Sequence, residues 1–114
     1  MNIILMRHGA AVPFAMNDGD RELTPEGKSE ASRTGTQLKH GGWIPESVFC
    51  STRIRAQQTA ALVLESLGCD LESQMIDGIT PEDDWSEAMA VIESRASDRS
   101  LFVFHQPILT DIVG

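Results

Sequence analysis

Two histidines and two arginines lie at or near the ends of apolar segments in this 114-residue chain. They are Arg7, His8, Arg55 and His105. The apolar segments that they follow, directly or within about one helical turn, are 2–6, 47–50 and 101–104. The chain is acidic, with a net charge of −8 and nine Lys and Arg residues, so a gathering of cations would be informative.

Together these four side chains suit the chemistry of a phosphoryl group. Two guanidiniums can hold the non-bridging oxygens through forked, charge-assisted hydrogen bonds and offset the negative charge during transfer. A neutral imidazole can attack phosphorus and form a covalent intermediate, while its other nitrogen donates to a fixed acceptor. Gly9 would permit a tight backbone turn and a close approach to the phosphate.

The segments between these positions alternate between strand and helix patterns. We expect strands at 2–6, 47–50, 74–76 and 101–104. Such alternation predicts an α/β fold, a three-layer α/β/α sandwich around a largely parallel sheet. Ligands of such sheets bind beyond the carboxyl ends of the strands, which is where the four basic side chains are expected.

Helices are expected between the strands. Thr24 is a suitable cap for a helix that ends before Gly41, and apolar spacing predicts a second helix at 54–67. Thr80 and Asp83 resemble a capping box that begins a third helix. A further amphipathic helix begins at 107, and the chain ends about two turns into it.

Four segments resemble the signatures of the histidine phosphatase superfamily, also called the phosphoglycerate mutase-like superfamily. In chain order they are LMRHG at 5–9, LTPEG at 23–27, STRIRAQQTA at 51–60 and FHQP at 104–107. They are similar to the RHG, LTxxG and SxxxRAxQTA motifs and to the segment that carries the second histidine of the family. The resemblance covers essentially the whole chain and is greatest to the short, SixA-type phosphohistidine phosphatases.

The resemblance implies a phosphoglycerate mutase-like fold and a role for each basic residue. His8 would be the nucleophile, and the phosphate pocket would contain Arg7, Arg55, His105 and the backbone at Gly9. Arg55 rather than Arg53 matches the arginine of the family, because it directly precedes Ala56. Arg53 is then interpreted as a surface residue, although it could touch a substrate.

Two questions about the site stay open at this stage. Larger family members supply an acidic proton donor after the third strand, and the candidates here are Asp77, Glu82, Asp83 and Asp84. The last three could instead be charges that the dipole favours at a helix N-terminus. Arg21 could bind the phosphate from its loop or be a solvated loop charge. His40, near the end of a helix, is assigned no function.

The composition limits the partners of the protein. The acidic balance opposes binding to nucleic acid or to anionic membranes. Cys50 and Cys69 lack metal-ligand spacing, and the first apolar run is too short for a signal peptide or a membrane span. We expect one cytoplasmic domain over residues 1–114, without metal or cofactor, which is either unusually short or truncated at its C-terminus.

The predicted function is hydrolysis of a phosphomonoester or phosphoramidate through phospho-His8, and the family resemblance implies phosphohistidine on a protein as the substrate. A small-molecule phosphomonoesterase or mutase is the first alternative, and a deep pocket with a carboxylate near His8 would favour it. The second alternative is a binding module that recognises phosphorylated partners without turnover.

Overall fold

A parallel four-stranded sheet lies at the centre of the structure, a computed structural model that describes residues 3–13, 15–80 and 83–104. The strands are β1 (Ile3–Arg7), β2 (Ser47–Cys50), β3 (Gln74–Met75) and β4 (Ser100–Phe104). Their order across the sheet is β1-β4-β2-β3, and every neighbouring pair is parallel. The predicted parallel sheet is confirmed, and β4 is inserted between the first two strands of the chain.

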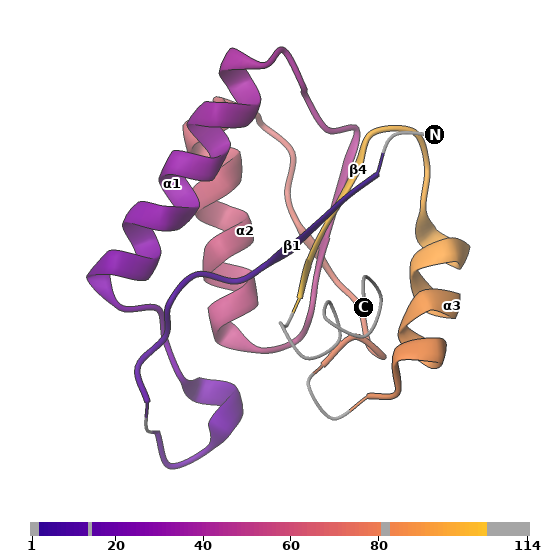
Figure 1. Cartoon of the computed structure of the whole chain (residues 1–114). Coiled ribbons are helices and arrows are strands. Elements are labelled where there is room, and N and C mark those ends of the chain that lie inside the picture. Colours follow the sequence, from indigo (N-terminus) through magenta and orange to yellow (C-terminus); the bar gives the residue numbers. More distant parts are fainter. Residues whose placement is uncertain (1–2, 14, 81–82, 105–114) are drawn as a thin grey trace.

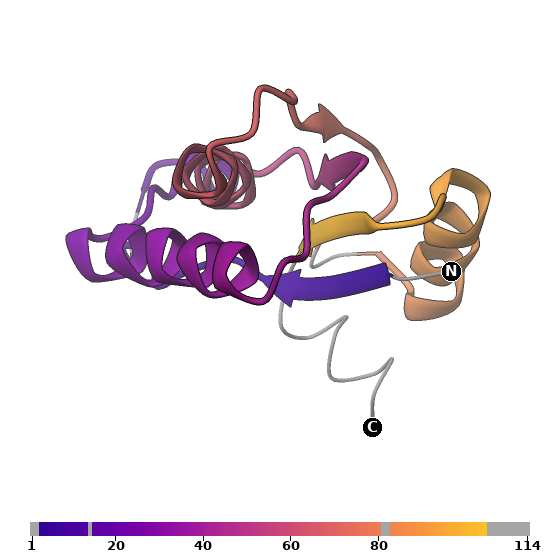
Figure 2. The same ribbon diagram turned by 90° about the horizontal axis from the view of Figure 1, so that it is seen from above.

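Helices cover both faces of this sheet. Helices α1 (Pro25–His40) and α2 (Ile54–Leu67) lie on one face, and α3 (Trp85–Arg95) lies on the other (Figures 1 and 2). The connections from β1 to β2 and from β2 to β3 run in one direction across the sheet, whereas the return to β4 runs in the opposite direction. Because such crossovers are right-handed, α3 must lie on the opposite face. The α/β/α prediction is confirmed.

Alternate side chains of the central strands build the two halves of the core. Leu101 and Val103 of β4 belong to the cluster beneath α1 and α2. Phe102 and Phe104 belong to the cluster beneath α3, where the Phe102 ring stacks on Phe49 with centroids 5.0 Å apart. This two-residue alternation is the normal geometry of a strand buried on both faces.

The two long helices begin and end where the sequence predicts. The side chain of Thr24 caps α1 by accepting a hydrogen bond from the Gly27 N–H at 3.0 Å. Helix α2 ends at Gly68, whose φ of 70° lies in the left-handed region that glycine adopts readily. None of the helices in the described ranges has the length and apolar character needed to cross a membrane.

The third helix begins later than the capping-box pattern predicts. It starts at Trp85 after the N-cap Asp84, which makes no side-chain capping hydrogen bond. The predicted contact between Thr80 and Asp83 is nevertheless present, since the backbone N–H and the hydroxyl of Thr80 both donate to Asp83 Oδ2, at 2.7 Å each. This correction has a physical reason, since Thr and Asp side chains stabilise non-helical turns as well as helix starts. The helix predicted from 107 onward lies outside the described residues.

Candidate active site

The carboxyl ends of β1, β4 and β2 lie side by side at one edge of the sheet (Figure 1). Beyond β1, the His8 N–H donates to the carbonyl of Phe104 at 3.0 Å. Beyond β2, the Ser51 N–H donates to the carbonyl of Val103 at 3.1 Å. The segments that carry His8 and Ser51 are therefore both held to β4 where they leave the sheet.

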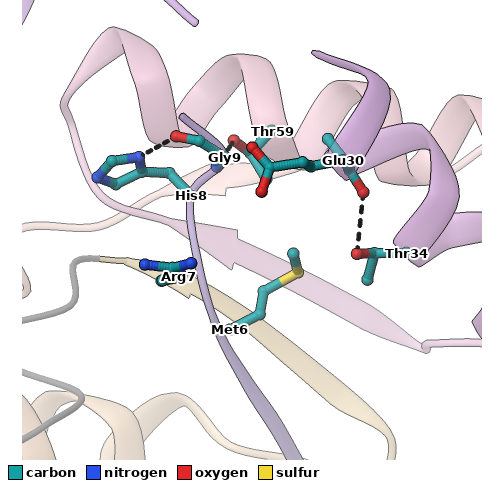
Figure 3. A pocket seen from close by; sticks show the side chains of 8 residues that line it. Met6, Arg7, His8, Gly9, Glu30, Thr34 and Thr59 are labelled. Atoms are coloured by element: carbon teal, nitrogen blue, oxygen red, sulfur yellow. Dashed lines mark hydrogen bonds between the residues drawn. The ribbon is translucent and has the colours of Figure 1, made fainter. Parts of the chain in front are cut away.

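The imidazole of His8 has a defined hydrogen bond on one of its nitrogens. Its Nδ1 lies 2.6 Å from the backbone carbonyl oxygen of Gly9 (Figure 3). A carbonyl can only accept, so Nδ1 carries the proton and donates. In the neutral ring, Nε2 then has a lone pair and is the nitrogen able to attack an electrophile.

Three guanidinium groups act on this ring. Burial lowers the pKa of His8 most, and the hydrogen bond to Gly9 opposes that shift. Charge repulsion from Arg55, Arg21 and Arg7 lowers the pKa further. Three of the basic residues singled out in the sequence thus act electrostatically on His8, and this environment favours the neutral ring that a nucleophile requires.

Arg55 is placed by the first turn of α2. Its side chain is 3% exposed, whereas Arg7 is exposed and Arg21 is half-buried. The Nε of Arg21 donates to the Val12 carbonyl at 2.7 Å, which ties its side chain to the loop after β1. Arg53 lies against the short 3-10 helix η1 (Asp18–Asp20), since a Cβ on Gly19 would be 2.9 Å from its Nη1.

Sequence reasoning assigned no role to two residues of α2 that link the other segments. The Thr59 hydroxyl accepts from the Gly9 N–H at 3.1 Å and donates to the Arg55 carbonyl at 2.8 Å. The side-chain oxygen of Gln58 accepts from the Leu23 N–H at 2.8 Å. The segments at 5–9 and 23–27 are thus both bound to α2. The positions of Thr59 and Gln58 in the sequence gave no signal of these contacts, because the donors are main-chain groups.

Two glycines allow the loop after His8 to lie against the start of α1. A Cβ on Gly9 would be 2.5 Å from the carbonyl oxygen of Gly27, and a Cβ on Gly27 would overlap the carbonyl oxygen of Ala10. No side chain fits between these backbones. Both glycines therefore serve the close approach of one backbone segment to the other, and the predicted approach of Gly9 to a phosphate stays a prediction.

A pocket of about 210 Å³ opens beside His8. Its lining includes Arg7, His8, Glu30 and Thr59 (Figure 3). The carboxylate of Glu30 lies on the opposite side of Gly9 from the imidazole. The pocket is thus basic on the side of Arg7 and His8 and acidic on the side of α1.

The same arrangement of segments occurs in known proteins. Residues 3–80, more than half of the chain, match the model of the histidine phosphatase superfamily, branch 1. The chain belongs to the histidine phosphatase superfamily. The phosphohistidine phosphatase SixA homolog of Haemophilus influenzae is 31% identical to this chain. The alignment covers 100% of this chain and 76% of that protein.

Other members of the superfamily match a smaller part of the chain or a smaller share of their own length. The mitochondrial serine/threonine-protein phosphatase Pgam5 of Drosophila ananassae is 37% identical over 62% of the chain. The alignment spans about a quarter of that protein (25%).

Solved structures of SixA proteins share the fold. The structure of the protein histidine phosphatase SixA complexed with tungstate has a TM-score of 0.82 and 28% identity, over 99% of this chain and 74% of that one. A candidate SixA from Agrobacterium tumefaciens has a TM-score of 0.86 over 97% of this chain and 73% of that one. At 21% identity, the second likeness concerns the fold alone.

The described candidates for the acidic proton donor differ in their surroundings. Asp77 is exposed, Asp83 accepts from Thr80, and Asp84 accepts from Ser86 at 2.5 Å. The described part of the chain contains no group of three His, Cys, Asp or Glu side chains that could hold a metal ion. Glu82 and His105 lie outside the described residues, so the place of the second histidine stays a prediction.

Proposed function

We propose that this histidine phosphatase hydrolyses phosphoryl groups through a covalent intermediate on His8, without a metal. The observation that carries the proposal is the His8 ring, whose Nδ1 donates to the Gly9 carbonyl and on which three guanidiniums act electrostatically. This arrangement combines a neutral nucleophile with the charge needed to hold a phosphoryl group.

In the first step, His8 Nε2 attacks phosphorus as the bond to the leaving group breaks. Arg7, Arg21 and Arg55 hold the non-bridging oxygens, and the nearly full burial of Arg55 strengthens its interaction with them. By family resemblance, His105 donates a further hydrogen bond to the transferred group. In the second step, water attacks phospho-His8, which releases inorganic phosphate and restores the neutral ring.

The proposed substrate is phosphohistidine on a protein. The SixA relatives support this substrate class by name, and tungstate in one of their structures is a tetrahedral oxyanion like phosphate. An imidazole can leave as a neutral ring when its second nitrogen is protonated, whereas an alkoxide needs a strong acid. Among the described residues, the carboxylate that lines the pocket with His8 is Glu30, which lies away from the attacking Nε2.

A small phosphate ester is the rival substrate, because Glu30 does place a carboxylate in the His8 pocket. This carboxylate, however, accepts a hydrogen bond from the backbone N–H of Ala10 at 3.0 Å. For the proposed activity, the cytoplasm is the expected location and a phosphorylated protein domain is the expected partner.

The test compares release of phosphate from a phosphohistidine-bearing protein domain and from sugar phosphates. We expect preference for the protein, acid-labile labelling of His8, and unchanged rates in EDTA. His8→Ala should abolish turnover and labelling, whereas His40→Ala, on the exposed end of α1, should change neither. Retained turnover in His8→Ala would reject the mechanism. A preference for sugar phosphates would reject the substrate, and binding without turnover would indicate a recognition module.

A further inference from the structure

The peptide unit between Gly9 and Ala10 is hydrogen-bonded at both ends. Its carbonyl oxygen accepts from His8 Nδ1 at 2.6 Å. Its N–H donates to Glu30 Oε1 at 3.0 Å. Because a peptide unit is planar and rigid, the direction of the N–H determines the direction of the carbonyl. The carboxylate on α1 and the imidazole are therefore joined through a single rigid group.

We propose that Glu30 is a positioning residue for the nucleophile. It holds the Gly9–Ala10 peptide in the orientation that keeps the proton of His8 on Nδ1 and leaves Nε2 free to attack. This role rests on the proposed function of His8, and it concerns a residue that none of the catalytic assignments above includes.

A carboxylate suits this task better than a neutral acceptor. A hydrogen bond to a charged acceptor is stronger, and it polarises the peptide so that the carbonyl oxygen becomes more negative. The more negative oxygen is a better acceptor for the Nδ1–H of His8. Glu30 is half-buried and Ala10 is exposed, so water competes for this bond and the expected effect is moderate.

The neighbouring backbone groups are held independently of Glu30. Thr59 accepts from the Gly9 N–H at 3.1 Å, and the Thr24 N–H donates to the Ala10 carbonyl at 2.9 Å. Loss of the Glu30 carboxylate would therefore release one peptide plane while the loop stays attached to both helices. This makes a local effect on the imidazole separable from unfolding.

The position of Glu30 argues against a direct role in proton transfer to the leaving group. In Figure 3 its carboxylate lies beside Gly9 and Thr59, and the imidazole lies on the other side of Gly9. Nε2, the nitrogen that would face the substrate, is the ring nitrogen remote from Gly9. A general acid must reach the leaving atom, which is opposite Nε2 in an in-line attack.

The test uses two variants at Glu30 and one control on the same helix. Glu30→Ala removes the acceptor, Glu30→Gln keeps an oxygen acceptor without the charge, and Glu26→Ala changes an exposed carboxylate in the first turn of α1. We expect Glu30→Ala to lower kcat about tenfold with little change in KM, at the low end of the effect of removing groups that orient metal-bound histidines. Glu30→Gln should retain most of the kcat that Glu30→Ala loses, and Glu26→Ala should have the kcat of the wild-type protein.

A spectroscopic measurement separates positioning from stability. The ¹⁵N shifts of the His8 ring, assigned by their absence in His8→Ala, report which nitrogen carries the proton. We expect a proton on Nδ1 in the unchanged protein and in Glu30→Gln, and a mixture of tautomers in Glu30→Ala. An unchanged ring spectrum in Glu30→Ala would overturn the proposal, whether or not activity falls. The spectra need no turnover, so a failure to form phospho-His8 would reject the proposed function separately.

Discussion

The hydroxyl of Thr59 accepts a hydrogen bond from the backbone N–H of Gly9 at 3.1 Å, across 50 positions of the sequence. The same hydroxyl donates to the carbonyl of Arg55 at 2.8 Å, and its side chain is fully buried. One hydroxyl thus joins the loop of the nucleophile to the helix turn that carries the buried arginine. The relative position of the two functional groups depends on it.

Replacement of Thr59 by Val should therefore lower both stability and turnover. Valine keeps the shape but leaves the Gly9 N–H without its acceptor, a loss of about 1–3 kcal/mol in the free energy of unfolding. Thr59→Ser keeps the hydroxyl and loses one methyl group, about 1 kcal/mol. Urea unfolding measures the two losses of stability. Steady-state kinetics should show a lower kcat in Thr59→Val and an unchanged kcat in Thr59→Ser. Equal kcat in the two variants would contradict the linking role.

Replacement of Arg55 by Ala should lower kcat by about 10²- to 10³-fold, the usual effect of removing one group that stabilises charge in the transition state. Arg55 is 3% exposed, so its interaction with the phosphoryl oxygens is poorly screened by water. Arg33→Ala, at an exposed position of α1, is the control and should have no effect. A loss of less than tenfold in single-turnover rate would show that another arginine has this role.

Alanine substitutions at Gly27 and Gly41 should have opposite effects on stability. A Cβ at Gly27 overlaps the Ala10 carbonyl, so Gly27→Ala should destabilise the protein by about 1–3 kcal/mol and disturb the loop after His8. At Gly41, φ is −78°, and an added Cβ would lie 3.5 Å from its nearest neighbour, the Gln37 carbonyl oxygen, so Ala fits. Gly41→Ala should stabilise by about 0.4–1 kcal/mol. Thermal unfolding of both variants measures the two effects, and equal melting temperatures would contradict them.

The pH dependence of activity should follow the lowered pKa of His8. Burial, followed by repulsion from the three arginines, keeps this pKa below 6.5, against the effect of the Gly9 hydrogen bond. The attacking ring must be neutral, so kcat/KM should fall as the pH drops through the lowered pKa. It should level off at higher pH, where the ring is neutral. An acidic limb with a midpoint above 6.5 would contradict the assignment of His8 as the titrating nucleophile.

The lowered pKa of His8 also makes the free energy of unfolding depend on pH. Between the pKa of His8 in the folded protein and 6.5 in the unfolded chain, the unfolded chain binds more protons. The free energy of unfolding therefore rises with pH through this window and levels off above it. His8→Gln should lack this part of the slope. Urea unfolding at several pH values measures it, and identical slopes in both proteins would exclude the linkage.

Local pattern was sufficient to predict most of the elements. The apolar spacing of Val63, Leu64 and Leu67 and the glycine that follows them define the end of α2 as the structure has it. The strand-end rule then located His8 and Arg55, because it needs only a parallel sheet and the ends of its strands. These predictions depend on groups that are close together in the sequence.

Features that depend on distant partners were not predictable in this way. The insertion of β4 between β1 and β2 is a matter of long-range pairing, and the roles of Glu30 and Thr59 depend on main-chain donors in another segment. The start of α3 was predicted wrongly because Thr80 and Asp83 bond in a turn as readily as in a helix cap. Local sequence does not show which partner is used.

The central place of β4 also affects how the protein matures during synthesis. Strands β1 and β2 do not pair with each other, and both pair with β4 at residues 100–104. A nascent chain that has not yet exposed these residues from the ribosome lacks the strand that brings its two earlier strands together. The candidate site should consequently form only once residues 100–104 have emerged, in one cooperative event, rather than build up gradually as the polypeptide lengthens.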